Sequence, residues 1–437
     1  LETVTNEAEL RWIASLKPRD GAASTDRPDS IRTVLKHHQT ESLDWQIAAW
    51  VAGLPGVLNA DEQGLGKTLQ TIVFLAWLQA NKSEDRGPLL VVAPTSLLVN
   101  WEQEVARHLK EPGLGHLIRL YGSAIGTRKL TGRQGRDIDG GEAKLDLEFL
   151  HEAVREKRAH RFWVLTTYTT LVNYQHSLAK MPFAAAVFDE IQALKNPFSM
   201  RAEAVRSVKA NFRIGLTGTP IENSATDLWA IMDQIAPGSL DSLEAFKHCY
   251  GTPTSENMAD LHRIVFKPRS SVPALAIRRL KSAVVSDLPE KSRRIHPRRM
   301  PQHQSLAYED AKLKLAQRGA GAALKMLHHI RTVSVHPVLG EVLPDADFIS
   351  ASARLQAAFD VLRTIANKGE RALVFIEHRR MQYRFIELAK AEFGLASVEL
   401  INGDTPINKR QGIVNRFQQQ QNTLGFDLLV LGPKAAG

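Results

Sequence analysis

The stretch DEQGLGKT, residues 61–68, carries the residue types that bind phosphate groups. Glycines at positions 64 and 66 let the backbone turn its N–H groups toward phosphate oxygens. Lys67 adds a positive charge, and Thr68 adds a hydroxyl that can bind Mg²⁺. The preceding GVLNA is typical of a buried strand and the following TLQTIVFLAWL of an amphipathic helix, which is the setting a phosphate-binding loop requires. The usual pattern has glycine where this chain has Asp61, but an aspartate side chain can also support a turn.

An acid pair much later in the chain complements this loop. Asp189 and Glu190 end the apolar run AAAVFDE. Acidic side chains at the carboxyl end of a strand beside a phosphate loop serve phosphoryl transfer. We expect Asp189 to hold Mg²⁺ together with Thr68, and Glu190 to orient and deprotonate the attacking water. The two sites predict a phosphate-binding hydrolase that uses Mg²⁺, with Lys67, Asp189 and Glu190 as catalytic residues.

The elements that must position these residues follow an alternating pattern. From residue 31 to 245, short apolar runs such as LLVVAP, FWVLTTY and FRIGLTG alternate with amphipathic stretches. This rhythm predicts an α/β fold with a doubly wound parallel sheet. A second α/β rhythm begins near residue 351. We predict a flexible lead-in at residues 1–30 and a first lobe at 31–245, which contains a surface insertion at 131–146. A helical basic protrusion and linker would follow at 246–350, and a second lobe at 351–437.

The positive charge of the chain is concentrated in one segment. The 437 residues carry a formal net charge of +9, and residues 263–299 hold eleven Lys and Arg against two Asp and Glu, so the remainder is balanced. A concentrated basic segment suits a polyanionic partner, although a solvated basic surface is the alternative.

The lone Cys249 excludes an internal disulfide framework and a cysteine-cluster zinc site. No apolar run is long enough to span a bilayer, and the first residues do not resemble a signal peptide. We expect a cytoplasmic protein without membrane contact or structural metal, and the absent initiator Met suggests a fragment.

Taken together, these motifs resemble the Swi/Snf-type ATPases of helicase superfamily two, from about residue 35 to the end. In that family the sequence pattern of the loop is D-E-x-G-x-G-K-T, so Asp61 matches the family's own variant. Further matching segments follow in order: VVAPTSLLVNWEQE, LTTYTTL, DEIQALKN, LTGTPIEN, IRRLKSAVVSDLPEK, MLHHIRTVSVHPVL and INGDTPINKRQGIVNRF. The resemblance implies two RecA-like lobes, the second incomplete. It also implies an ATP hydrolase with ATP and Mg²⁺ as cofactors, which acts as a motor that translocates on double-stranded DNA without obligatory strand separation.

The resemblance also implies roles for individual residues. The nucleotide site would consist of Gln39, Asp61, Glu62, Gly64, Leu65, Gly66, Lys67 and Thr68, with the Gln39 carboxamide on the adenine. Coupling of hydrolysis to motion would involve Gln192, Thr217, Gly218 and Thr219. Nucleic-acid contacts would come from Pro94, Thr95, Thr166, Thr167, Lys195, Asn196, Gly403 and Lys434. Gln192 stands where the family often has histidine, which would alter coupling without removing hydrolysis. We expect His328, His329 and His336 to be structural, because no cysteine or carboxylate stands at ligand spacing.

Two other functions stay open beside the translocase: a helicase of the same superfamily that separates DNA or RNA strands, and an ATP-gated DNA clamp with little turnover. The resemblance places an arginine finger after Gly437, and such a finger speeds related reactions by roughly 10³ or more. We therefore expect the chain as given to bind ATP but to hydrolyse it slowly. Short protrusions suggest a prokaryotic, nucleoid-associated member that serves repair, transcription recycling or phage defence.

Overall fold

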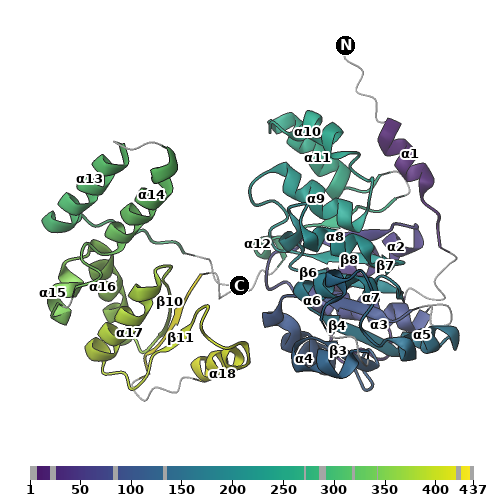
Figure 1. Ribbon diagram of the computed structural model, residues 1–437, viewed down its shortest axis with the longest axis horizontal. Helices are drawn as coiled ribbons and strands as arrows, with labels where there is room; N and C mark the ends of the chain where they lie inside the picture. Colours follow the sequence, from purple (N-terminus) through teal and green to yellow (C-terminus); the bar gives the residue numbers. More distant parts are fainter. Residues whose placement is uncertain are drawn as a thin grey trace, which may run out of the picture. The chain divides into compact units, whose positions relative to one another are not determined.

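A computed structural model of the chain describes residues 7–19, 26–81, 87–130, 135–269, 272–284, 292–316, 320–341, 343–419 and 425–433 (Figure 1). Its contacts divide it into two compact units, residues 1–289 and 290–437. Each unit contains a parallel β-sheet with helices packed on it. The predicted α/β class with two parallel-sheet lobes is therefore confirmed.

The first unit is built on a seven-stranded sheet in the order β3-β4-β2-β6-β8-β1-β9, in which every pairing is parallel. Its strands are β1 Gly56–Asn59, β2 Leu89–Val92, β3 His116–Leu120, β4 Phe162–Thr166, β6 Ala185–Asp189, β8 Arg213–Leu216 and β9 Ala276–Ile277, and a separate pair joins β5 Pro182–Phe183 to β7 Lys209–Ala210. All residues of β1, β2 and β6 are buried. Helices cover both faces of such strands, which explains why they read as continuous apolar runs.

The helices of this unit form two packed series, as a doubly wound sheet requires. One series is α2, α3 and α4, and the other is α6, α8, α9, α10 and α11. The helices are α1 Glu7–Ser15, α2 His37–Val51, α3 Lys67–Asn81, α4 Leu98–His108, α5 Glu148–Arg155, α6 Tyr168–Asn173, α7 Gln175–Leu178, α8 Met200–Ser207, α9 Ala225–Ile235, α10 Leu243–Tyr250, α11 Ser255–Phe266 and α12 Lys281–Val284, with 3₁₀ turns at Thr95–Leu97, Gly122–Arg128, Asp137–Asp139, Ala159–Arg161 and Ile191–Leu194. Helix α3 is buried from Leu69 to Leu78, and Trp77 packs edge-on against Trp50 of α2. The helix that follows the phosphate loop is thus firmly seated in the core.

Two segments expected at the surface are tied to this unit. Helix α1 lies in the predicted lead-in, and the Trp12 indole donates a hydrogen bond to the Pro237 carbonyl at 2.9 Å. In the predicted insertion, the buried carboxylate of Asp137 accepts hydrogen bonds from the backbone N–H groups of Lys144 and Ser177. Both segments therefore contain anchoring side chains.

The second unit carries a three-stranded parallel sheet in the order β10-β12-β11, formed by β10 Arg371–Phe375, β12 Asp427–Leu431 and β11 Glu399–Ile401. Its helices are α13 Gln302–Ala316, α14 Ala320–Val335, α15 Asp345–Ser350, α16 Ala353–Asn367, α17 Arg379–Phe393 and α18 Ile407–Gln418. The predicted helical segment 246–350 is thus divided, because α10, α11 and β9 belong to the first unit and α13 and α14 to the second. The functional boundaries at 245 and 350 stay predictions.

His336 has a structural environment in this unit. Its ring is fully buried and stacks on Phe348 with ring centroids 3.8 Å apart. Nδ1 accepts from the Val338 N–H, so Nε2 carries the hydrogen and donates to the Phe348 carbonyl at 2.9 Å. Both ring nitrogens are occupied by protein partners, and burial lowers the pKa of His336.

Within the ranges given above, no helix combines the length and hydropathy needed to cross a membrane. In the same ranges, no three His, Cys, Asp or Glu side chains are grouped so that they could hold a metal ion.

Candidate nucleotide site

The loop between β1 and α3 has the backbone shape that its glycines predict. Gly64 and Gly66 have φ values of +87° and +83°, which L side chains rarely adopt. The Lys67 ammonium folds back and donates to the Asp61 carbonyl at 2.8 Å. Gln39, on α2, lies against the loop, because its Nε2 donates to the Leu65 carbonyl at 3.4 Å and a Cβ on Gly66 would lie 2.7 Å from that nitrogen. The fold therefore brings the predicted glutamine and the phosphate loop together.

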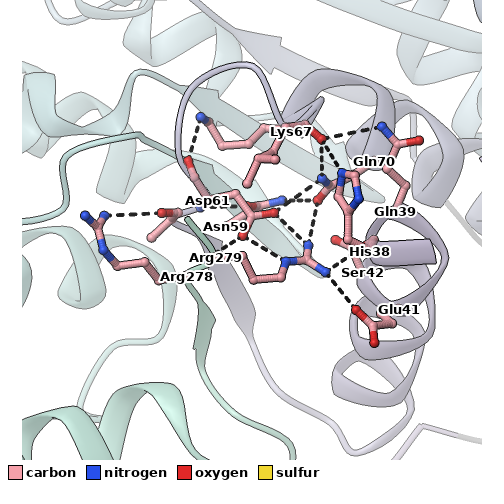
Figure 2. A network of polar contacts seen from close by, with 12 residues as sticks. His38, Gln39, Glu41, Ser42, Asn59, Asp61, Lys67, Gln70, Arg278 and Arg279 are labelled. Atoms are coloured by element: carbon pink, nitrogen blue, oxygen red, sulfur yellow. Dashed lines mark hydrogen bonds and ion pairs between the residues drawn. The ribbon is translucent and has the colours of Figure 1, made fainter. Parts of the chain in front are cut away.

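Asp61 anchors the loop through a buried ion pair. Its side chain is 0% exposed, and the Arg279 guanidinium donates to both carboxylate oxygens, at 2.6 and 3.1 Å (Figure 2). The Arg279 backbone N–H adds a bond of 2.9 Å, and Gln70 Nε2 donates at 3.3 Å. The sequence predicted that this aspartate supports a local turn and, through the family resemblance, belongs to the nucleotide site. The structure instead gives it a cationic partner 218 residues later in the chain.

The acid pair lies two strands from the loop, since β8 separates β6 from β1. Asp189 is 6% exposed, and its carboxylate accepts from the Trp101 indole N–H at 2.8 Å and from the Glu190 backbone N–H at 2.9 Å. Burial raises the pKa of Asp189 to about 6, which outweighs the lowering effect of the Trp101 hydrogen bond. A carboxylate that is costly to ionise in a dry site gains strongly from a nearby cation.

The side chains of the loop and the acid pair share one electrostatic environment. Burial lowers the pKa of Lys67, and the charges of Glu190, Asp189 and Asp61 oppose this effect. Glu190 has a left-handed backbone (φ 50°, ψ 50°), and its carboxylate accepts from Gln192 Nε2. The Oε1 atom of Gln192 is one of several described side-chain polar atoms that are buried without a hydrogen-bond partner.

These residues fit a magnesium nucleotide. The loop offers N–H groups and the Lys67 ammonium to phosphate oxygens. Thr68 and Asp189 offer oxygens, which Mg²⁺ prefers. The unpartnered Gln192 oxygen beside Glu190 could accept a hydrogen bond from a water in the site.

The predicted coupling segment lies between the loop and the acid pair. Thr217 follows β8, and its backbone N–H donates to the Asn59 carbonyl at the end of β1. Its buried hydroxyl accepts from the Thr219 N–H at 3.0 Å. Gly218 lies against the loop, since a Cβ there would come within 3.0 Å of Gln63 Cγ. The segment therefore contacts the nucleotide loop directly.

The predicted nucleic-acid residues have different environments. Thr95 and Asn196 are exposed, and Pro94 is half-buried. Thr166 and Thr167 are buried, with their hydroxyls bonded to the Leu120 carbonyl and capping α6 at the Thr170 N–H. Contacts at these two positions would have to come from their neighbours. Lys195 is paired with Glu222, and Gly403 belongs to the second unit. Lys434 lies outside the described residues.

The second unit has a basic depression at the carboxyl ends of its strands. Its volume is about 1320 Å³, and the lining includes Asn402, Gly403 and the arginines Arg331, Arg354, Arg379, Arg380 and Arg410. Glu377 is the carboxylate of the lining. Such a concentration of guanidinium groups suits phosphate groups.

Three residues of the site were not assigned roles from the sequence. Arg279 lies within the matching segment IRRLK. Asp61 has no arginine close to it in sequence, and this could have suggested a cationic partner from a distant segment. Trp101 stood within NWEQE, but nothing in the spacing links it to Asp189. The Tyr168 hydroxyl donates to the Asp189 carbonyl at 2.8 Å, and no sequence signal predicts this contact.

Comparison with known proteins places the chain in a family. The family model for the SNF2-related domain matches residues 38–339. The chain belongs to the SNF2-related family. This confirms the predicted resemblance to Swi/Snf-type ATPases of superfamily two.

SNF2-related relatives cover most of the chain. Zorya protein ZorD of Escherichia coli O139:H28 is 30% identical over 92% of this chain and 38% of its own length. Helicase SWR1 of Eremothecium gossypii is 31% identical over 72% of this chain and 21% of its own length. The chain thus spans well under half the length of these relatives. The Sulfolobus solfataricus SWI2/SNF2 ATPase core, solved in complex with double-stranded DNA, is similar with 24% identity and a TM-score of 0.48, covering 94% of this chain and 80% of that one.

Proposed function

We propose that this chain is the motor core of an ATP-dependent translocase on double-stranded DNA. One observation carries the proposal: in a chain of the SNF2-related family, the phosphate loop, the Thr217–Thr219 segment and the acid pair follow the adjacent strands β1, β8 and β6. The loop that would bind phosphates, the segment that would couple hydrolysis to motion and the acid pair that would activate water therefore lie side by side.

Each residue of the site has a separate role in nucleotide binding or hydrolysis. Lys67 and the loop N–H groups hold the phosphates, while the Arg279–Asp61 pair fixes the loop that presents them. Thr68 and Asp189 hold Mg²⁺, which when bound neutralises charge on the phosphate oxygens. Glu190 orients the attacking water and accepts its proton, and the Gln192 amide fixes the Glu190 carboxylate. Gln39 recognises the adenine.

Grip on DNA would come mainly from phosphate contacts. The arginines of the second-unit depression supply the positive charge, and the exposed Thr95 and Asn196 of the first unit offer neutral hydrogen-bonding groups. Binding of this kind is salt-sensitive and weakly dependent on sequence. A DNA substrate implies a cytoplasmic, nucleoid-associated location in a prokaryote, and repair, transcription recycling and phage defence are the tasks we consider.

The test measures steady-state ATP hydrolysis by the 437-residue chain and by the longest natural protein that contains it. Duplex DNA, single-stranded DNA and duplex RNA are titrated, with Lys67→Ala as the blank. We expect stimulation by duplex DNA that the blank lacks. Stimulation by single strands or RNA instead would identify a strand-separating helicase. ATP binding without turnover in either protein would identify the clamp.

A further inference from the structure

The segment that follows β9 runs along the phosphate loop as an extension of the sheet. The N–H groups of residues 58, 60 and 62 donate to the carbonyls of residues 275, 277 and 279, at 2.9, 2.8 and 3.0 Å. This parallel register continues the β1–β9 pairing beyond both strands. Two residues further on, the Lys281 N–H donates to the Glu62 carboxylate at 2.7 Å. The backbone of Lys281 is therefore fixed beside the loop.

The Lys281 side chain lies on the loop itself. A Cβ placed on Gly64 would come within 2.8 Å of both Cε and Nζ of Lys281. The absence of a side chain at Gly64 thus allows the lysine to approach the loop backbone, in addition to allowing the φ of +87°. In the described part of the chain, no carboxylate forms an ion pair with the Lys281 ammonium. It differs in this from Arg279 and Lys195, which pair with Asp61 and Glu222.

Lys281 and Lys67 stand close enough for their charges to interact. Burial is the main cause of the lowered pKa of Lys67, and the charge of Lys281 lowers it further. Two ammonium groups around one loop repel each other unless an anion lies between them. The N–H groups of a glycine-rich loop at the start of a helix attract the same anion. Three sources of positive potential therefore converge on one place.

We propose that Lys281 is a second phosphate-binding lysine of the nucleotide site, which contacts the same phosphate chain as Lys67. This inference rests on the proposed ATP site. Arg279 has the supporting role, since its pair with Asp61 holds the segment and the loop in register. Lys67 lies at the start of α3, and Lys281 lies at the start of α12, in the segment that follows edge strand β9. The nucleotide is thereby held by two elements more than 200 residues apart.

The experiment measures affinity of the whole chain for ATP and for ADP by calorimetry, at fixed ionic strength, with Mg²⁺ and with EDTA. We expect Lys281→Gln to weaken binding of both nucleotides roughly tenfold or more, and Lys281→Arg to restore most of it. Lys247→Gln, on α10, removes the same charge from an exposed position of the same unit and should leave affinity unchanged. Thermal unfolding without nucleotide should be the same for all three variants, because the Lys281 ammonium has no ion pair with a carboxylate among the described residues.

A footprint supplies a second, independent measurement. Lysines are acylated briefly with an N-hydroxysuccinimide ester, with and without ATP, and located by mass spectrometry. We expect ATP to protect Lys67 and Lys281 but not Lys247. If Lys281→Gln binds ATP like the wild type and Lys281 is not protected, while Lys67→Ala has lost binding, the second lysine is refuted and the ATP site stands. If the wild type itself binds no ATP, the proposed function fails instead.

Discussion

Each unit pairs an arginine with an aspartate just after a sheet strand, and the two pairs differ in burial. Asp61 follows β1 and is 0% exposed, and its partner Arg279 is 19% exposed. Asp404 follows β11 and is 44% exposed, and its partner Arg379 is 65% exposed. The first pair is surrounded by further donors from Gln70 and the backbone. Equivalent chemistry thus serves two purposes: a buried pair fixes geometry, whereas an exposed pair leaves its arginine free to exchange partners.

The largest effect should come from breaking the buried pair. Arg279→Leu leaves the Asp61 carboxylate in the interior without its cation, and we expect a loss of about 3–5 kcal/mol in the free energy of unfolding of the first unit. Urea unfolding followed by tryptophan fluorescence measures this unit alone, because all seven tryptophans lie between Trp12 and Trp229. A double variant, Arg279→Leu with Asp61→Asn, should recover part of the loss because the uncompensated charge is gone. A loss below about 1 kcal/mol for the single variant would show that the pair behaves like a surface pair.

The indole that holds Asp189 gives the next largest effect. Trp101→Phe keeps an aromatic ring in the core but removes the N–H that donates to the carboxylate. The pKa of Asp189 should rise further, because this hydrogen bond lowers it. We expect ATP affinity to fall roughly tenfold in Mg²⁺ and to change little in EDTA, since the aspartate acts through the cation.

The comparison of the two media is the control for Trp101→Phe. A variant that merely disturbed the core would lose affinity equally in both. Trp163→Phe, at a buried tryptophan on strand β4 of the same unit, provides a matched substitution that leaves the hydrogen bond to Asp189 in place. Equal losses for the two variants would contradict the positioning role of Trp101.

These long-range partners mark where prediction from the sequence stops. Strands β1, β2, β4, β6 and β8 were predicted to within a residue or two, because buried parallel strands are continuous apolar runs. The loop and the acid pair were found because their residues are consecutive. Strand β9 has two residues, too few for a pattern, and its pairing with β1 spans more than 200 residues. The partners of Asp61 and Asp189 are 218 and 88 residues away, at separations that only the folded sheet defines.

A pH effect confined to the second unit should be smaller. Burial lowers the folded-state pKa of His336 below its ordinary 6.5, so the unfolded chain takes up the proton first as the pH falls. Stability of this unit should therefore be full above about pH 6.5 and decrease below it, down to the folded pKa. Amide hydrogen exchange of peptides from residues 345–367, corrected for its intrinsic pH dependence, measures the change. His336→Phe keeps a ring against Phe348 without a titrating group, and the pH dependence should shrink; an unchanged dependence would point to other groups.

The smallest effect on stability should come from the exposed pair, where the contrast with Asp61 is sharpest. Asp404→Asn removes one charge from a solvated ion pair, and we expect the free energy of unfolding to change by no more than about 1 kcal/mol. Its effect on DNA should go the other way. Freed from Asp404, Arg379 can contact a phosphate in the basic depression, so affinity for duplex DNA should rise modestly and the salt dependence should steepen by about one counterion. Fluorescence anisotropy of a labelled duplex across a salt series measures both quantities, with Arg379→Gln as the reciprocal variant that should lower them. If both substitutions leave the salt slope unchanged, the exposed pair does not contact DNA phosphates, and the arginines elsewhere in the depression would have to carry the proposed grip.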